Sequence, residues 1–295
     1  MRLPNAHRPA KQPRRSPLNL EQLDERAVPA VFTVTNLTDS GAGSLRNAIN
    51  RANATPGLDE IQFGVRGTVV LTAALPAFTS PVTVSGDSAP GFTSGPTVFV
   101  NANGFQGLVF GSGSGNSTLQ SLGVIRAAGA GVTLVSRNVS LFGNYIGAQG
   151  NGVLPAGNTG NGVLVQGTAT GSTIGGAGPN QANLISGNGA NGIAIVGGGK
   201  NTVQGNLIGT DASGTRRLAN GTNGIVITGG STGNLIGGRT PANPPGTTPN
   251  ELSGERSPDG NLISGNTANG VVITGGATGN TLSGNFVGTD TTGVR

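Results

Sequence analysis

One stretch of the sequence occurs twice, and this repetition constrains the fold more than any other feature. Residues 183–211 read NLISGNGANGIAIVGGGKNTVQGNLIGTD, and residues 261–290 read NLISGNTANGVVITGGATGNTLSGNFVGTD, which is one residue longer. Near-copies of about 20 to 50 residues are typical of repeat proteins, in which each copy buries its apolar face only against its neighbour. The repetition therefore predicts a solenoid.

Three kinds of short apolar segment follow one another in a fixed order. The first kind is GVLVQG at 162, GIAIVGG at 192, GIVITGG at 224 and GVVITGG at 270; the second is NLISGN, NTVQGN, NLISGN and NTLSGN, beginning at Asn183, Asn201, Asn261 and Asn280; the third is NYIGA, NLIGT and NFVGT, beginning at Asn144, Asn206 and Asn285. Strands this short carry too few apolar residues for a sandwich, and hairpins throughout would require two-residue Asn-Gly loops flanked by strict alternation. Winding in one direction accommodates them, so three strands predict one coil of a parallel β-helix.

Matched positions of successive coils are expected to stack into columns. The first face is predicted to bury Val163, Ile193, Ile225 and Val271 beside Val165, Ile195, Ile227 and Ile273, while Leu164, Ala194, Val226 and Val272 face out. Ile185, Val203, Ile263 and Leu282 are assigned to a second face, and Ile146, Ile208 and Val287 to a third. Glycine, with 55 residues, and asparagine supply the corners, because both tolerate positive φ. Stacked asparagines are expected to form amide ladders, which is a structural role and not a ligand-binding one.

The chain divides into three parts. Residues 1–30 form a basic, Pro-rich leader that is expected to be disordered, and residues 31–60 form a cap consisting of a strand and a short helix. Ser44 is placed as the N-cap of that helix, whose apolar stripe is Leu45, Ala48, Ile49 and Ala52. Residues 61–295 hold the repeats, with a Pro-rich loop inserted at 239–260. The last copy stops at GTDTTGVR, where the earlier one continues, so we expect the chain to be truncated.

Two segments resemble known proteins. The core Ser44-Leu45-Arg46-Asn47-Ala48-Ile49 is similar to the segment that opens many bacterial right-handed parallel β-helix proteins of the pectin-lyase-like kind, although Gly43 and Asn47 replace the usual Cys and Glu. The stretch LNLEQLDERAVPA resembles a leader found near the N-termini of planctomycete envelope and extracellular proteins. These resemblances imply an all-β, right-handed parallel β-helix with a short amphipathic capping helix. They also imply an extracellular or cell-surface location.

Composition excludes several classes of protein. With Cys 0, neither disulfides nor a Cys-based zinc site can form. Of the 17 Lys and Arg residues, six lie in the leader, so the body carries little net charge, and the aromatic content is 3%. A nearly neutral body without interleaved aromatics argues against nucleic-acid binding. The sequence has no apolar run long enough for a membrane span.

Residues able to perform acid-base chemistry are sparse. The single histidine is His7 in the leader, and the single tyrosine, Tyr145, is expected to pack over a strand. Asp211 and Asp290 occupy matching positions in G-T-D-x-x-G, where we expect them to cap turns, with calcium binding as the alternative. The acids Glu251, Glu255 and Asp259 cluster in the Pro-rich loop beside Arg256 and are expected to form a solvated charge group. We therefore predict no catalytic residues and no cofactor other than calcium.

The leading functional hypothesis is a non-catalytic, adhesin-like structural module. Its partner would be a surface polysaccharide or another cell-envelope protein. Parallel β-helices also host pectate lyases, polygalacturonases and uronan epimerases, so a fragment of a polysaccharide-active enzyme whose catalytic coils lie elsewhere is the main alternative. A passenger joined to an outer-membrane barrel is a third possibility.

Overall fold

The computed structural model describes residues 28–238 and 259–293 and contains three parallel sheets. Sheet A consists of β1 (Val31–Val34), β2 (Asp59–Phe63), β4 (Val82–Ser85), β7 (Thr118–Gln120), β10 (Ser140–Phe142), β13 (Thr173–Ile174), β16 (Thr202–Val203), β19 (Leu235–Gly237) and β22 (Thr281–Ser283). Sheet B consists of β3 (Gly67–Val70), β5 (Val98–Asn101), β8 (Leu122–Ile125), β11 (Tyr145–Ile146), β14 (Leu184–Ile185), β17 (Leu207–Ile208), β20 (Leu262–Ile263) and β23 (Phe286–Val287). Sheet C consists of β6 (Leu108–Phe110), β9 (Val132–Leu134), β12 (Val163–Gln166), β15 (Ile193–Val196), β18 (Ile225–Thr228) and β21 (Val271–Ile273).

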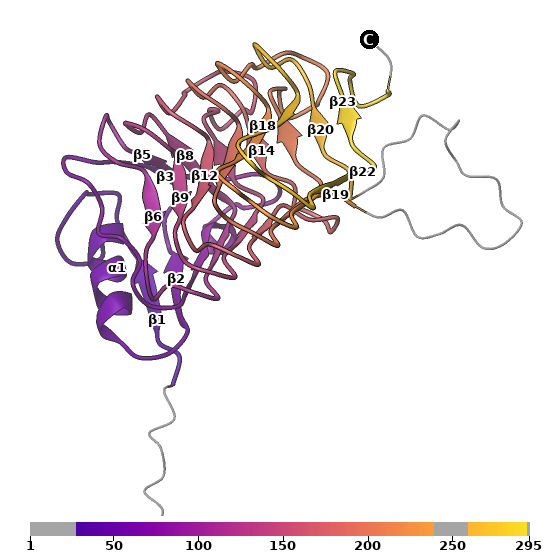
Figure 1. Ribbon diagram of the computed structural model, residues 1–295. Helices are drawn as coiled ribbons and strands as arrows, with labels where there is room; N and C mark the ends of the chain where they lie inside the picture. The colour runs from indigo at the N-terminus through magenta and orange to yellow at the C-terminus, as the bar shows by residue number, and fades with distance from the viewer. Residues whose placement is uncertain (1–27, 239–258, 294–295) are drawn as a thin grey trace, which may run out of the picture.

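From β4 on, the chain visits the sheets in the order A, B, C, and each strand pairs in parallel with its counterpart one coil away. Such an arrangement is a parallel β-solenoid, as the repeats predicted (Figure 1). Side chains along each strand alternate between the interior and the outer surface, because successive side chains of a strand point to opposite sides. Each coil thus contributes inward side chains to the interior and outward side chains to three outer faces.

The predicted columns of the first face are confirmed in sheet C. Val163, Ile193, Ile225 and Val271 lie in register, and so do Val165, Ile195, Ile227 and Ile273. Six of these eight side chains are fully buried, whereas Val271 and Ile273 belong to the last described strand of sheet C, where Ile273 is 43% exposed. The outward column also has the predicted register, although Ala194 in it is 3% exposed. Short apolar triplets fenced by Gly and Asn therefore located these columns correctly.

The predicted second face is wrong, because it mixes two sheets. Val203 pairs with Ile236, which in turn pairs with Leu282, in sheet A, whereas Ile185 and Ile263 align with Ile208 in sheet B. Ile146 and Val287, the other members of the predicted third face, lie in this same column of sheet B. The error has a physical origin. The segments that enter sheet A and sheet B both begin with Asn and both have a Gly soon after their buried apolar residue, so the local sequence does not distinguish the two sheets.

A helix closes the N-terminal end, as predicted. Helix α1 (Leu45–Ala54) begins after Ser44, whose side chain accepts a hydrogen bond from the Asn47 N–H at 3.2 Å. The residues buried on it are Leu45, Ala48, Ile49 and Ala52, the predicted stripe. They pack against β1 and β2, at the opposite end of the solenoid from β22 and β23 (Figure 1). An ion pair between Arg46 and Asp39, 2.7 Å apart, fixes the turn before the helix.

The first coils are filled by phenylalanine. Phe63, Phe78 and Phe110 are among the largest fully buried side chains of the described residues. The rings of Phe78 and Phe110 stack with their centroids 4.7 Å apart and an interplanar angle of 18°. Aromatic volume thus closes the interior near α1, while Ile and Val fill the later coils.

Asparagine ladders join the later coils at their corners, confirming the expected structural role of this residue. Asn144, Asn183, Asn206, Asn261 and Asn285 precede sheet B; Asn158, Asn188, Asn220 and Asn266 follow it; Asn201, Asn234 and Asn280 precede sheet A; Asn161, Asn191, Asn223 and Asn269 precede sheet C. Within each ladder, Nδ2 donates to Oδ1 of a neighbouring coil over 2.8 to 3.0 Å. Asn206 is fully buried, and its Nδ2 also donates to the Ile174 carbonyl at 2.8 Å. Buried polar side chains are thereby paired coil by coil.

The corner before sheet A requires a left-handed backbone in successive coils. Asn138 has φ 55°, Gly171 φ 69°, Lys200 φ 55° and Gly233 φ 66°. Glycine and asparagine adopt this conformation at little cost, whereas lysine does not. Lys200 is therefore a strained member of a column that otherwise has suitable residues.

Two predicted segments fall outside the described residues. The predicted leader spans residues 1–30, of which 1–27 are not described. Most of the predicted Pro-rich loop at 239–260 is also not described, including Glu251 and Glu255. Asp259, at its end, accepts a hydrogen bond through its backbone carbonyl from the Gly205 N–H at 3.1 Å.

Candidate binding groove on the outer face of sheet B

The outer face of sheet B carries an apolar column. Phe99, Gly123, Tyr145, Leu184, Leu207, Leu262 and Phe286 follow one another in register. Leu184 is 1% exposed and Leu262 is fully buried, although both alternate with inward-facing residues. Gly123 is required where it stands, because an added Cβ would lie 1.9 Å from the Phe99 ring. The face is apolar and covered, unlike an ordinary solvated sheet surface.

The connections at the two edges of this face are long in alternate coils. On the edge toward sheet C, long connections cover 147–162 and 209–224, whereas those at 186–192 and 264–270 are short. On the edge from sheet A, the long connections are 175–183 and 238–261, and they belong to the coils that are short on the other edge. In the length of its connections, this face therefore repeats every two coils.

The two long loops toward sheet C have the same internal structure and touch each other. Isolated antiparallel bridges join Ala148 to Pro155 in one loop and Thr210 to Arg217 in the other. The Ala212 N–H donates to the Gly152 carbonyl at 2.9 Å. Ala148, Leu184 and Leu218 form a buried cluster between these loops and the sheet. The loops thus form a wall along one side of the column.

Asp211 holds the turn of its own loop. Its Oδ1 accepts hydrogen bonds from Ser213 Oγ at 2.7 Å, from the Thr215 N–H at 3.1 Å and from the Arg216 N–H at 3.2 Å. Burial acts to raise the pKa of Asp211, but these hydrogen bonds and the nearby charge of Arg216 outweigh it and hold the pKa below its ordinary value. The side chain therefore acts as an ionised turn cap.

Asp290 occupies the matching position two coils later, on the loop after β23. Its Oδ1 accepts from the Thr292 N–H at 2.8 Å and from Thr292 Oγ1 at 2.6 Å. Strand β20 separates β17 from β23, so the structure places the two aspartates on equivalent loops two coils apart. No group of three or more His, Cys, Asp or Glu that could hold a metal is found between residues 28 and 238 or between 259 and 293. Calcium binding stays a prediction.

A hollow of about 230 Å³ opens beside Tyr145, between the walls of the groove. It is lined by Ser94, Gly95, Gly143, Tyr145, Asn180, Ala182, Leu184, Leu207 and Ala212, none of which is charged. Typical small-molecule pockets measure about 300–1,000 Å³, so this hollow has room for one ring of a longer ligand. Its polar side chains are a hydroxyl, a phenol and an amide, which donate and accept hydrogen bonds without carrying charge.

Tyr145 is the aromatic member of this lining. Its ring packs on the buried cluster of Phe99, Ile125 and Ala156 and on the cluster around Leu184. This confirms that it covers a strand, but the hydroxyl also reaches the hollow, which the sequence analysis missed. Gly95 leaves room for it, because a Cβ there would lie 2.8 Å from the phenol oxygen. Burial raises the pKa of Tyr145, so its hydroxyl remains a neutral hydrogen-bonding group.

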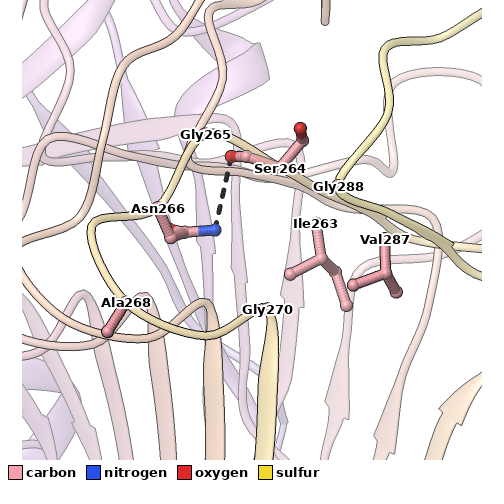
Figure 2. Close-up of a pocket in the computed structure, with 8 residues that line it drawn as sticks. All are labelled: Ile263, Ser264, Gly265, Asn266, Ala268, Gly270, Val287 and Gly288. Carbon is pink, nitrogen blue, oxygen red and sulfur yellow. Dashed lines mark hydrogen bonds between the residues drawn. The ribbon is translucent and has the colours of Figure 1, made fainter. Parts of the chain in front are cut away.

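A second hollow, of about 130 Å³, lies at a corner of the last described coil. Ile263, Ser264, Gly265, Asn266, Ala268, Gly270, Val287 and Gly288 line it (Figure 2). Figure 2 shows Ile263 beside Val287, and Asn266 Nδ2 donating to the Ser264 carbonyl at 3.3 Å. One coil earlier, the space next to Gly224 is filled by Ile263, Asn266 and the Gly270 carbonyl. The hollow is the corresponding corner of the last described coil.

Comparison with models of known protein families gives no match, and neither does comparison with curated proteins. No helix among the described residues combines the length and apolar character needed to cross a membrane.

Proposed function

We propose that this protein is a non-catalytic β-solenoid of the cell surface or the extracellular space, and that it binds an uncharged saccharide in the groove over sheet B. The observation that carries the proposal is the hollow beside Tyr145. A half-buried aromatic ring next to hydroxyl and amide groups suits a sugar, whose C–H face packs on the ring while its hydroxyls exchange hydrogen bonds. The absence of charge in the lining favours a neutral sugar over a uronate.

The structural role of Asp211 favours binding over hydrolysis. Glycoside hydrolysis requires a carboxyl pair flanking the scissile bond, one of them able to transfer a proton. Asp211 instead holds its own loop with three hydrogen bonds and has a lowered pKa. Such a group supports the wall of a groove.

Two further parts of the proposal rest on general physical grounds and on resemblance. We infer that the coils wind in the right-handed sense, because crossovers between parallel strands of one sheet are right-handed in about 98% of cases. Export is proposed from the resemblance of LNLEQLDERAVPA to leaders of envelope proteins.

The test is titration of the purified chain with soluble neutral polysaccharides and with a uronate polymer, by calorimetry, alongside assays for newly formed reducing ends and unsaturated sugars. We expect binding of a neutral polymer without cleavage. Tyr145→Leu should weaken that binding about tenfold, and the fold should tolerate leucine because Leu207 stands two coils on in the same column.

Phe105→Leu provides the matched control, since Phe105 is an aromatic residue that is 36% exposed and lies outside the hollow. This variant should bind like the parent protein. Cleavage of any polymer would replace the proposal with an enzymatic function. Equal binding by the Tyr145→Leu variant would remove the hollow from the binding site.

A further inference from the structure

A buried carboxyl group with one unpartnered oxygen lies at the start of β2. Asp59 is 1% exposed and is buried on the same side of the strand as Ile61 and Phe63. Its Oδ1 accepts a hydrogen bond from the Ala30 N–H at 2.8 Å, whereas its Oδ2 is buried and has no hydrogen-bond partner among the described residues. A buried charge is costly unless it is paired. Asp59 therefore suits a partner that carries positive charge.

No basic side chain supplies that charge. Within residues 28–238 and 259–293, the single ion pair joins Arg46 to Asp39. Arg51, in the last turn of α1, lies over the Phe32 ring, with its guanidinium carbon 4.5 Å from the ring centroid. The group that does contact the carboxyl of Asp59 is the backbone nitrogen of Ala30.

The same corner in other coils shows what a backbone N–H requires. By strand pairing, Asp59 belongs to the column that precedes sheet A, whose other polar members are Ser117, Ser172, Asn201, Asn234 and Asn280. In this column, Asn201 Oδ1 accepts from the Ser172 N–H and Asn234 Oδ1 accepts from the Asn201 N–H, both at 2.9 Å. Uncharged side chains thus suffice to accept a peptide N–H at this corner. The acid stands only where the donor is Ala30.

An α-amino group at Ala30 would satisfy both oxygens of Asp59. A peptide nitrogen carries one proton, and Oδ1 already accepts it. An α-ammonium group carries three protons and a positive charge at neutral pH, so it can donate to Oδ2 as well. Hydrogen bonds between charged partners are about twice as strong as neutral ones. Ala30 is held in position for this pairing, because its carbonyl accepts from the Glu60 N–H at 2.8 Å.

We propose that the chain is processed by hydrolysis of the Pro29–Ala30 peptide bond, and that the new amino terminus forms an ion pair with Asp59. The reactants are water and an endopeptidase. Hydroxyl from water adds to the Pro29 carbonyl carbon as the C–N bond breaks. The Ala30 nitrogen takes up the other proton of that water and then the proton released by the new Pro29 carboxyl group.

The bond is placed where an endopeptidase can reach it. Val28 is 77% exposed, Pro29 is exposed, and neither belongs to a helix or a strand. Strand β1, which begins one residue after Ala30, is at the edge of sheet A and pairs only with β2 among the described strands. Edge strands open locally at lower cost than central ones. The ion pair would then fix the first strand of the solenoid after cleavage.

The experiment uses the full chain with the recognition sequence of a site-specific endopeptidase inserted directly before Ala30, so that cutting leaves Ala30 as the first residue. The matched control carries the same sequence directly before Val28. Cutting before Ala30 should raise the melting temperature by at least about 3 °C. Cutting before Val28 should leave it unchanged, because that amine lies two residues from Asp59.

Asp59→Asn separates the ion pair from other effects of cutting. In the intact chain this substitution should leave the melting temperature unchanged or raise it, because the amide oxygen still accepts from Ala30 and no buried charge remains. In the chain cut before Ala30, it should remove the gain. A gain that persists in Asp59→Asn, or a cut chain no more stable than the intact one, would overturn the proposal.

Labelling with an amine-reactive ester gives a readout that does not depend on stability. The Ala30 amine should react at least about tenfold more slowly than the Val28 amine of the control, because it must first leave its ion pair. In Asp59→Asn the two rates should be similar. Finally, N-terminal sequencing of the protein recovered from the cells that produce it should give Ala30 as the first residue. A different first residue would overturn processing at this bond.

Discussion

The coils near α1 and the coils of the C-terminal half build the same architecture with different side chains. Near the helix, phenylalanines such as Phe78 and Phe110 fill the interior, and serine caps a corner: Ser117 Oγ accepts the Val82 N–H at 2.9 Å. In the later coils, isoleucine and valine columns fill the interior and asparagine ladders cap the corners. There, Asn206 Oδ1 accepts the Asn183 N–H at 3.2 Å.

The two kinds of corner differ in how far they connect the chain. The hydroxyl of Ser117 donates to the Ser114 carbonyl at 2.7 Å, three residues away in the same turn. The amide of Asn206 donates to Asn261 Oδ1 at 2.9 Å in the next coil. A serine corner therefore links two coils, whereas an asparagine corner links three. We expect the later coils to depend on their corners and the first coils on their aromatic interior.

The largest effect is expected from Phe110→Ala, which attacks the aromatic interior. Phe110 is fully buried against Phe78, so the substitution should leave a cavity and lower the free energy of unfolding by about 4 kcal/mol. In the later coils, Ile195→Val removes one methylene from a fully buried side chain and should cost about 1 kcal/mol. Urea denaturation measures both. Similar losses for the two variants would contradict the special dependence of the first coils on aromatic volume.

The next effect concerns the corners. Asn206→Ala leaves the buried Asn183 backbone N–H without its acceptor and removes the bonds that Asn206 Nδ2 donates to the Ile174 carbonyl and to Asn261 Oδ1, and should cost about 3 kcal/mol. Ser117→Ala should cost about 1 kcal/mol, because it unpairs the Val82 N–H alone in the neighbouring coil. Hydrogen exchange should show faster opening on both sides of Asn206, in β14 and β20. If Ser117→Ala proved as damaging, the distinction between the two corners would fail.

A smaller and opposite effect is expected at Lys200. Because its φ is 55° in a column where Gly171 and Gly233 occupy the same conformation, Lys200→Gly should raise the free energy of unfolding by about 0.5–1 kcal/mol. Lys200→Ala is the control, since it removes the same charge and length but retains a Cβ. Alanine should give no gain. Equal stabilisation by both variants would mean that the backbone conformation is not the cause.

The smallest effect is expected from acid, and it concerns both regions. Burial acts to raise the pKa of Asp39, near the helix, but hydrogen bonds from Thr72 and Arg46 and the charge of Arg46 lower it overall. Asp211, in a later loop, also has a pKa below the ordinary value of 3.8. A lowered pKa in the folded state contributes stability above pH 3.8, and this stability is lost as pH falls through the folded pKa.

Asp39→Asn and Asp211→Asn should therefore flatten the decline of the melting temperature between neutral pH and strongly acidic pH. Thermal melts across this range measure the slope. The double variant should show the sum of the two changes, because the groups lie in separate parts of the solenoid. An acid slope that is unchanged in both single variants would show that these carboxylates do not differ between folded and unfolded chains.

The sequence predicted the elements whose chemistry is unambiguous. An apolar triplet such as Ile193-Ala194-Ile195, fenced by glycine, can only be a short strand with two buried residues, and Ser44 before an apolar stripe marks a helix start. The assignment of Ile185 failed because turns into sheets A and B share the same asparagine and glycine chemistry. Counting the strands of each coil in order would have placed Ile185 with Ile208.

The groove could not be predicted from the sequence, because the burial of its apolar column depends on how the neighbouring loops are placed. Leu184 and Leu207 look alike in sequence, yet Leu184 is 1% exposed and Leu207 is partly exposed. The difference depends on which edge of each coil has a long loop. The length of a loop does not show over which part of the sheet it packs. Tyr145 likewise reveals its neighbour Gly95 only in three dimensions.

The asparagine ladders also give the solenoid an electrical direction. Toward the C-terminal coils, Asn144 donates to Asn183, Asn158 to Asn188, and Asn201 to Asn234. The ladder before sheet C runs the other way, with Asn191 donating to Asn161. Amide dipoles aligned head to tail add together, so three rows outweigh one. The asparagine ladders together therefore contribute a dipole along the axis whose positive pole points away from α1.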